Sequence, residues 1–423
     1  MTAVILRATR QTFLALRMRN YRLYFVGQVI SASGTWMHTV ALGLLVLSSR
    51  LHGNGFDVGI VIALQFLPIL LAGSWGGLVA DRADKQRLLF ATQSASGVLA
   101  LALGLLTAFG TVTMTEVFVV AGLFGVVNLF DNPVRQTFVS EMVGRELLPN
   151  AVSLNSVVMN AARVVGPALG GVLIFTVGIA ACFLFNAASY GAVLVALARM
   201  RRAELYPAPA VAKAKGQVRQ GLRYAWSTPE LRRPLLAMSV VGVFAFNFPT
   251  TLPLLAEGTF HGGAGTYSAL TAAMGIGAVV GGLVVAHRSR PSESLLSVIG
   301  LAFGVMLAAV ALSPTEAVAM GALVLMGFCM IAFIATANAT LQLTAEPSMR
   351  GRVMALYATA FLGSTPLGAP LVGWIADATS PRIPLVVGAA AAVAASVPLA
   401  LHAFHRRPAE PGRPAATRPD LAA

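Results

Sequence analysis

Charged residues are scarce in this sequence. They make up 11% of its 423 residues, against about 25% in ordinary soluble domains, while hydrophobic residues make up 57%. A single soluble core stops growing at about 250–300 residues, so it cannot hide that much apolar surface. A lipid bilayer can cover that apolar surface. Membrane helices also tolerate the 41 glycines and 22 prolines better than soluble helices do. The composition therefore predicts a polytopic membrane protein.

The chain also lacks the motifs of common enzymes and pumps. It has no G-x-x-x-x-G-K-[ST] loop for a nucleotide and no H-E-x-x-H zinc motif, and its six histidines are scattered. Cys182 and Cys329 lie in apolar stretches without metal-ligand spacing. We therefore expect no enzyme, no ATP-driven pump, no cofactor and no metal site.

Twelve apolar stretches are each close to the ~20 residues that a helix needs to cross ~30 Å of hydrocarbon. The first is too long for the core of a signal peptide and is expected to be a retained anchor. A tight turn at Gly178 separates the fifth and sixth stretches, so eleven or thirteen spans stay open. We predict an all-α membrane protein with about twelve transmembrane helices, at residues 22–48, 58–80, 88–109, 115–138, 151–176, 180–198, 234–255, 266–286, 295–313, 316–341, 353–376 and 383–404.

The basic residues are distributed unevenly among the loops. If the amino terminus is cytoplasmic, 27 of the 30 lysines and arginines fall on the cytoplasmic side. Only Arg50 and Arg382 fall outside, and Arg163 lies within a span. This asymmetry is what the positive-inside rule describes, so we predict an inner-membrane protein with both termini cytoplasmic. The net charge of +14 is thus a topology signal that also favours anionic lipid headgroups, not a sign of nucleic-acid binding.

One long connection divides the chain into two sets of six spans. Short matches recur across it: the Gly-Gly-Leu-Val of Gly76–Val79 returns at Gly281–Val284, an offset of 205. Two six-helix halves are typical of transporters that rock about a central site. We predict two pseudo-symmetric six-helix bundles, with an N-terminal bundle at 1–198, a cytoplasmic linker at 199–233, a C-terminal bundle at 234–404 and a cytoplasmic tail at 405–423.

The most specific stretch is the short loop after the second span, here named the signature loop. It reads Gly77-Leu-Val-Ala-Asp81-Arg82-Ala-Asp84-Lys85-Gln-Arg87. It resembles the G-x-L-a-D-r-x-G-r-k loop of the major facilitator superfamily, except that Asp84 replaces the later glycine and Lys85 takes the first basic place. That departure is similar to bacterial exporters related to the enterobactin and macrolide efflux carriers. The resemblance implies the superfamily fold and a secondary transporter.

The residues of the signature loop suit a conformational latch. Gly77 permits close helix approach, and Asp81 can accept hydrogen bonds from a helix amino terminus, where the macrodipole favours an anion. Arg82 can pair with an acid at a neighbouring helix end. We predict that the loop holds the cytoplasmic side shut in one conformation and releases it in the other. The alternative is a turn whose charges only set topology.

Asp131 and Arg135 lie four residues apart near the cytoplasmic end of the fourth span. On a helix this spacing permits a local ion pair of a few tenths of a kcal/mol. In the superfamily an acid at this helix end commonly pairs with the arginine of the signature loop. We predict a charge relay of Asp131 and Arg135, and the resemblance implies that Asp131 pairs preferentially with Arg82.

The fifth span contains Gly166-Pro167-Ala-Leu-Gly170-Gly171, which resembles the G-P-x-x-G-G element of exporters. The proline bends the helix, and the small residues let a neighbouring helix pack closely. Packing explains each residue, so export follows from the resemblance alone.

Arg163 is the sharpest candidate for the substrate cavity. By helical rise it lies about 18 Å deep, near the middle of the bilayer, where a charge usually faces a cavity or a partner. Ser156 and Asn160 share its helix face. The alternative is a structural arginine that bonds carbonyls or a distant acid.

Three further polar residues are candidates for the cavity or for coupling. Asn128 and Asn247 come out at a depth similar to that of Arg163, and His38 lies further outward. His38 suits a proton carrier. Each of the three also suits a simple bridge between helices, worth about 0.6 kcal/mol.

Together these features predict a secondary active transporter, working by alternating access around a midplane cavity. We expect an efflux carrier for a siderophore- or drug-like small molecule, coupled to protons and acting as a monomer. An anion exchanger, a uniporter or an importer of the same fold stays open, as does a receptor or scaffold that binds without transport. The signature loop argues against a scaffold, because a scaffold does not need a latch.

Overall fold

The computed structural model describes residues 13–206, 217–287, 292–347 and 349–405, and within the signature loop the side chain of Asp81 lies outside the described part. Every regular element in these residues is helical. Up to residue 206 these are the short helix η1 (Leu14–Arg17), α2 (Arg19–Leu47), α3 (Gly55–Arg82), α4 (Lys85–Phe109), α5 (Met114–Thr176), α6 (Ile179–Ala198) and the short helix η2 (Arg202–Glu204).

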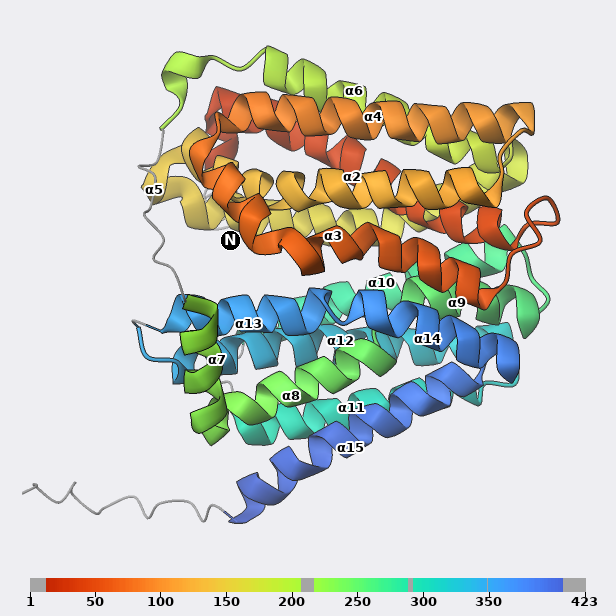
Figure 1. Ribbon diagram of the computed structural model, residues 1–423, viewed down its shortest axis with the longest axis vertical. Helices are drawn as coiled ribbons and strands as arrows, with labels where there is room; N and C mark the ends of the chain where they lie inside the picture. Colours follow the sequence, from red (N-terminus) through yellow and green to blue (C-terminus); the bar gives the residue numbers. More distant parts are fainter. Residues whose placement is uncertain (1–12, 207–216, 288–291, 348, 406–423) are drawn as a thin grey trace, which may run out of the picture.

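The helices from residue 217 onward form a second group. They are α7 (Gln217–Ser227), α8 (Pro229–Phe244), α9 (Phe248–Gly258), α10 (Ala264–His287), α11 (Glu293–Ala311), α12 (Glu316–Thr344), α13 (Arg350–Leu362), α14 (Thr365–Ala378) and α15 (Ile383–His405). Figure 1 shows the two groups as separate layers, with α7 lying across the helix ends of the second group.

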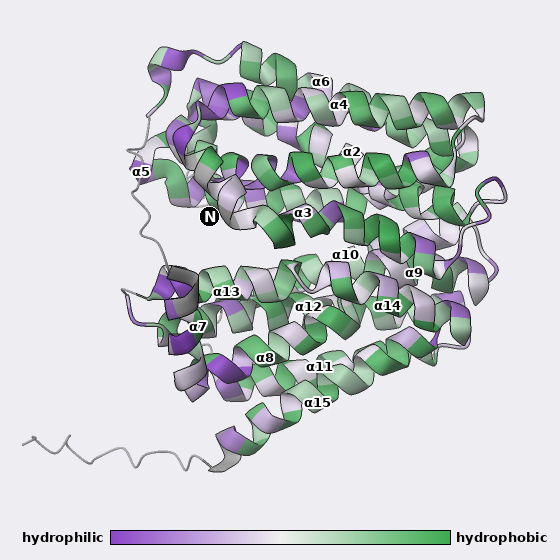
Figure 2. Ribbon diagram, in the orientation of Figure 1, coloured by the Kyte–Doolittle hydropathy of each residue, from purple (hydrophilic) through white to green (hydrophobic). Residues whose placement is uncertain are grey.

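Eleven helical segments in the described residues are long and apolar enough to cross a membrane. One of them, α5, has 63 residues and changes direction at Gly144, whose φ of 72° is not helical. It therefore contains two spans, and the prediction of about twelve is confirmed. Figure 2 shows hydrophobic residues along the helices and hydrophilic ones concentrated toward the two ends of the molecule.

Two of the predicted spans are broken helices. The seventh span is divided into α8 and α9 at residues 245–247, and Pro249 stands in the first turn of α9. The eleventh is divided into α13 and α14, and Pro366 stands in the first turn of α14. Proline fits the first turn of a helix because that turn has no intrahelical acceptor for its N–H groups.

The two ends of the bundle differ in charge. The arginine-rich end, on the left of Figure 1, carries the signature loop, the Gly144 bend and α7. The opposite end of the bundle is here named the far end. There the two arginines that fall outside the predicted cytoplasmic segments, Arg50 and Arg382, each bind the end of a helix. Arg50 donates to the carbonyl of Gly110 after α4, and Arg382 donates to the carbonyls of Ala311 (2.7 Å) and Ser313 (2.8 Å) at the end of α11. A helix carboxyl terminus favours a cation, which explains both exceptions to the charge asymmetry.

The two groups of helices meet mainly where α3 packs on α14 and α5 packs on α10. Close backbone contacts between α3 and α14 lie toward the far end. A Cβ at Gly373 would lie 2.0 Å from the carbonyl oxygen of Gly55, and a Cβ at Gly59 would lie 2.3 Å from that of Ala369. In Figure 1, α3 meets α14 on the right and diverges from α13 toward the left. The halves are therefore joined at the far end and separate toward the arginine-rich end.

Candidate functional site

The signature loop forms the tight connection between α3 and α4. Asp84 is the N-cap of α4, and its side chain accepts a hydrogen bond from the backbone N–H of Arg87 at 3.0 Å. This role explains why an aspartate occupies the position of the expected glycine, since aspartate is a preferred N-cap residue. Arg82 is exposed at the end of α3, while the predicted role of the Asp81 side chain falls outside the described part of the structure.

Lys85 ties the signature loop to its own half of the protein. Its ammonium group forms an ion pair with Glu141 on α5, and both side chains are only 10% exposed. The carbonyl of Glu141 also accepts a hydrogen bond from the backbone N–H of Tyr206, at 2.8 Å. The start of α4, the stretch of α5 before Gly144 and the first part of the linker are thus connected in one unit at the arginine-rich end.

Asp131 is the centre of a buried polar cluster and is 2% exposed. One carboxylate oxygen accepts hydrogen bonds from Thr92 and Gln93 on α4, each at 2.7 Å. The other accepts from Arg135, through Nε at 3.0 Å and through Nη2. Arg135 in turn donates to Gln28 on α2 at 2.8 Å. These five residues form the Asp131 cluster, and every contact in it lies within the first group of helices.

The predicted partnership of Asp131 with Arg82 is wrong in this structure. Arg82 is exposed at the end of α3, whereas Arg135 lies one turn along α5 from Asp131 and reaches it directly. Sequence reasoning also missed Gln28, Thr92 and Gln93. Their signal was available, because each is a polar residue inside an otherwise apolar span.

Arg163 is on α5 and lies beside α2 and α10. Its guanidinium sits over the ring of Trp36 on α2, 5.3 Å from the ring centroid, and Gly275 of α10 packs against its backbone carbonyl. Nε and Nη1 are buried and have no hydrogen-bond partner. Among the described residues, no carboxylate pairs with it. The two intramembrane arginines therefore differ, because Arg135 is paired within one half and Arg163 is unpaired at the seam between the halves.

Ser156 and Asn160, which were predicted to share the helix face of Arg163, lie on α5 as expected. Ser156 donates to the carbonyl of Val152 at 3.0 Å, and Asn160 donates to that of Ser156 at 2.9 Å. Ser156 is exposed, and Asn160 and Arg163 are half-buried. Both smaller side chains are thus anchored on their own helix, and neither supplies a partner for the guanidinium.

The structure does not bring the remaining candidates to Arg163. His38 is buried against the rings of Phe124 and Phe183, with centroids 5.1 and 4.9 Å away, inside the first group of helices. Asn247 lies at the break between α8 and α9, donates to Val243 at 2.6 Å and leaves its amide oxygen buried without a partner. Asn128 is half-buried on α5. Among the described residues, no hydrogen bond joins any of these three candidates to Arg163.

The Gly166–Gly171 element packs α5 between its neighbours. A Cβ at Gly166 would lie 2.5 Å from the Cβ of Trp36, and one at Gly171 would lie 2.6 Å from the hydroxyl of Ser268 on α10. Pro167 is buried, and Gly170 makes an ordinary contact with α2. The element therefore presses α5 onto the part of α2 that carries Trp36, the residue beneath Arg163.

Comparison with known proteins agrees with this architecture. The chain is 26% identical to the staphyloferrin A transporter of Staphylococcus aureus over 62% of this chain and 66% of that protein, just under two thirds of its length. It is 28% identical to the multidrug efflux pump Tap of Mycolicibacterium fortuitum over 84% of this chain and 89% of that pump. A crystal structure of a bacterial homologue of the human lysosomal transporter Spinster superposes with a TM-score of 0.69, at 14% identity, over 91% of this chain and 95% of that one.

The fold and these relatives define a membrane transporter of the major facilitator superfamily, which confirms the resemblance of the signature loop. Within the superfamily, the family described as transmembrane secretion effector, MFS_3, matches residues 10–417, and the chain belongs to that family. The family consists of transporters and not of enzymes, as the missing catalytic motifs predicted.

Replacing Gly166 tests the packing of α5 on α2. We expect Gly166→Ala to destabilise the protein by about 1–3 kcal/mol, because the new methyl group overlaps Trp36 in a filled interface. Melting curves in detergent measure the effect. Gly191→Ala on α6 is the matched control, since a Cβ there meets nothing within 4 Å. Equal melting temperatures for the two variants would contradict the packing role.

The Asp131 cluster gives a second prediction. Asp131→Ala leaves Arg135 buried without its partner, so we expect a loss of about 3–5 kcal/mol in stability. Glu204→Ala removes the exposed ion pair with Arg201 and is expected to cost less than about 1 kcal/mol. Denaturation of both variants in the same detergent compares them. A small loss for Asp131→Ala would show that the cluster contributes little to the fold.

Proposed function

We propose that this transporter exports a small siderophore- or drug-like molecule that carries an anionic group, and that Arg163 receives that group. The unpaired guanidinium at the seam carries the proposal. A charge in the middle of a membrane is costly unless it meets a partner or water, and the described residues provide no acid for it. A carboxylate or a similar anion of the substrate would supply the missing acceptor through a charge-assisted bond.

The position of Arg163 also supports a role in transport. It touches helices of both halves, through Trp36 on α2 and Gly275 on α10. A ligand bound there contacts both halves at once, so its binding energy can differ between the two conformations of the carrier. Trp36 offers a flat face beside the charge, which suits a ring or an apolar part of the substrate.

The direction of transport is proposed from the relatives. One of them is named for the transport of staphyloferrin A, and the other is named a multidrug efflux pump. Export of a related kind of molecule, driven by protons through a monomer in the inner membrane, fits these names and the exporter-like signature loop. Units 1–198 and 234–404 would rock against each other, joined by the linker at 199–233.

Anion exchange is a second candidate, favoured by one observation. Asp131, the acid of the predicted relay, already accepts hydrogen bonds from three residues within one half. This carboxylate is therefore held inside one half and does not lie at the seam, where the proposed substrate site is. Proteoliposomes distinguish the two mechanisms: a proton carrier accumulates substrate against an imposed pH gradient, whereas an exchanger requires an anion on the opposite side.

Variants of Arg163 test the substrate role. We expect Arg163→Ala to abolish efflux of an anionic dye such as carboxyfluorescein with little loss of melting temperature, because no protein acid loses its partner. Arg163→Lys keeps the charge but loses the planar fork, so dye binding should weaken by about tenfold or more. Dye efflux from cells and melting in detergent are the two measurements.

Arg135→Ala is the matched control, because it removes a paired intramembrane arginine. It should lower the melting temperature strongly by leaving Asp131 unpaired. If Arg163→Ala melts as early as Arg135→Ala while its folded fraction still binds dye normally, the substrate role is wrong. Unchanged efflux of the cationic dye ethidium in Arg163→Ala would show that the effect depends on the charge of the dye.

We also propose that the arginine-rich end faces the cytoplasm, on the basis of the charge asymmetry. A green fluorescent protein fused after Ala423, or inserted between Arg202 and Arg219, should fluoresce, and alkaline phosphatase at the same sites should be inactive. Phosphatase fused in the loop that contains Arg50 should be active. Phosphatase activity at either of the first two sites would reverse the orientation.

A further inference from the structure

The far end is held by a carboxylate that crosses from one half of the protein to the other. Asp377, near the end of α14, accepts hydrogen bonds from the backbone N–H groups of Gly55 and Phe56, each at 2.7 Å. These N–H groups open the first turn of α3, which belongs to the other half. Asp377 therefore caps a helix across the seam.

The remaining capping at this terminus is local. Asn54 and Asp57 form a capping box, in which each side chain accepts a bond from the backbone of the other at 3.0 Å. Asp57 is thus a carboxylate in the same helix turn as the groups that Asp377 binds, but its bond stays within one half. The N–H groups in the first turn of α3 thus have two sources of acceptors: Asn54 in the same half, and Asp377 in the other half.

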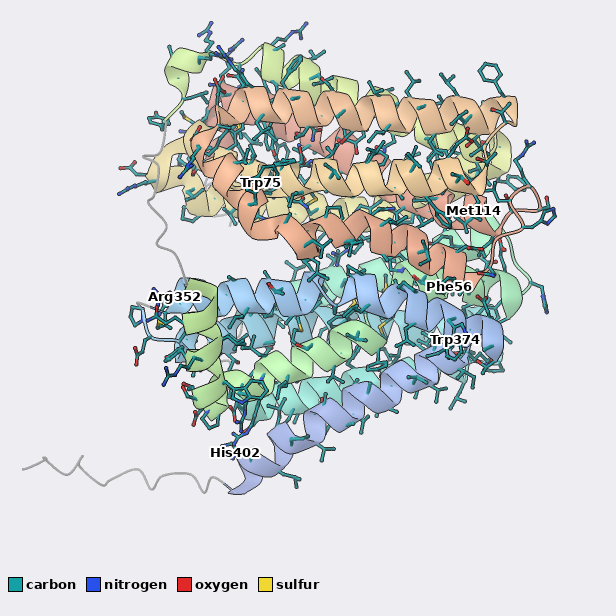
Figure 3. The ribbon with its side chains drawn as sticks, in the orientation of Figure 1. Phe56, Trp75, Met114, Arg352, Trp374 and His402 are labelled. Carbon is teal, nitrogen blue, oxygen red and sulfur yellow. The ribbon has the colours of Figure 1, made fainter. Side chains whose placement is uncertain are left out.

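The backbones come close enough for this bond only because of glycine. A Cβ at Gly55 would lie 2.8 Å from a carboxylate oxygen of Asp377 and 2.9 Å from the carbonyl of Gly373. Figure 3 shows Phe56 and Trp374 together at this end of the molecule, while Trp75 of α3 lies well away toward the arginine-rich end. The contact is thus specific to the joined end of the seam.

The sequence around Asp377 repeats that of the signature loop. The sequence Gly-x-x-Ala-Asp occurs at Gly77–Asp81 in α3 and at Gly373–Asp377 in α14, and in both helices the aspartate is the last residue but one. The eleventh span, of α13 and α14, runs antiparallel to α3, and each therefore ends where the other begins. The N-cap residue of α13 is Met349, which offers no side-chain cap of its own.

We propose that Asp377 is the latch of the far end and the counterpart of Asp81 at the arginine-rich end. Its two bonds exist while the halves are joined at the far end. When the halves separate at the far end, the carboxylate and both N–H groups lose these hydrogen bonds and bond to water instead. A contact present in only one conformation shifts the balance between the two, so Asp377 favours the state closed at the far end. The inference goes beyond the proposed function, because it does not depend on the substrate.

Distances between spin labels at the far end test the latch. Labels at Thr115→Cys and Ala317→Cys, exposed in the first turns of α5 and α12, report on opposite halves. The full chain, with Cys182→Ala and Cys329→Ala, is reconstituted in lipid nanodiscs and measured by pulsed electron resonance. In Asp377→Ala we expect the ratio of far-end-open to far-end-closed molecules to rise about fivefold, which corresponds to about 1 kcal/mol.

Two further variants separate the latch from a general loss of helix capping. Asp377→Asn keeps one acceptor and no charge, so it should shift the ratio in the same direction by a smaller factor. Asp57→Asn weakens the cap of the same helix within one half and should leave the ratio unchanged. An unchanged distance distribution in both Asp377 variants, or an equal shift in Asp57→Asn, would overturn the proposal. Since no variant here touches Arg163, failure of the latch leaves the substrate role untouched, and the reverse also holds.

Discussion

Hydrocarbon offers no hydrogen bonds, and this constraint organises the polar chemistry of the transporter. A polar group inside the membrane must find its partner within the protein or in a water-filled space. The carboxylate of Asp131 meets the requirement, since both of its oxygens accept hydrogen bonds from donors on α4 and α5. Arg163 does not meet it, and it lies at the seam between the halves. The unsatisfied charge is thus placed where a transported molecule can satisfy it.

The same constraint divides the polar residues by role. Contacts within one half, such as Lys85 with Glu141 and Asp131 with Arg135, survive when the halves rock. They give the first half the rigidity that rigid-body motion needs. Contacts across the seam, such as Asp377 with the first turn of α3, would have to form and break in every cycle of the proposed mechanism. Only the second kind can set the balance between conformations.

Much of the fold was predictable because the signal for a span is local. A run of apolar residues is read without knowledge of the rest of the chain, and all twelve predicted spans are helical. The broken seventh and eleventh spans were not separated, because hydropathy is indifferent to a break inside an apolar run. Pro249 and Pro366 mark where the second part of each span begins, and they are the local signal that hydropathy ignores.

The partners of polar residues were less predictable, because they depend on how the helices pack. The superfamily pattern predicted that Asp131 pairs with Arg82. In the structure Asp131 pairs with Arg135, which is one turn away on the same helix. Asp377 gave no signal by itself, since an aspartate near a helix end is common. Its meaning emerges only when the eleventh span is seen to run antiparallel to α3 and to share its Gly-x-x-Ala-Asp ending.

The exposure of Asp377 agrees with the demands of alternating access. A carrier must visit both conformations, so neither closed end can be stabilised by much more than a few kcal/mol. A buried ion pair across the seam would cost several kcal/mol to break and would trap one state. Asp377 is exposed at the rim, where water screens its bonds and replaces them as soon as the halves part. The seam therefore has a weak, exchangeable bond at its end and an unpaired charge near its middle, an arrangement that fits the proposed reversible closure and the proposed binding of substrate at Arg163.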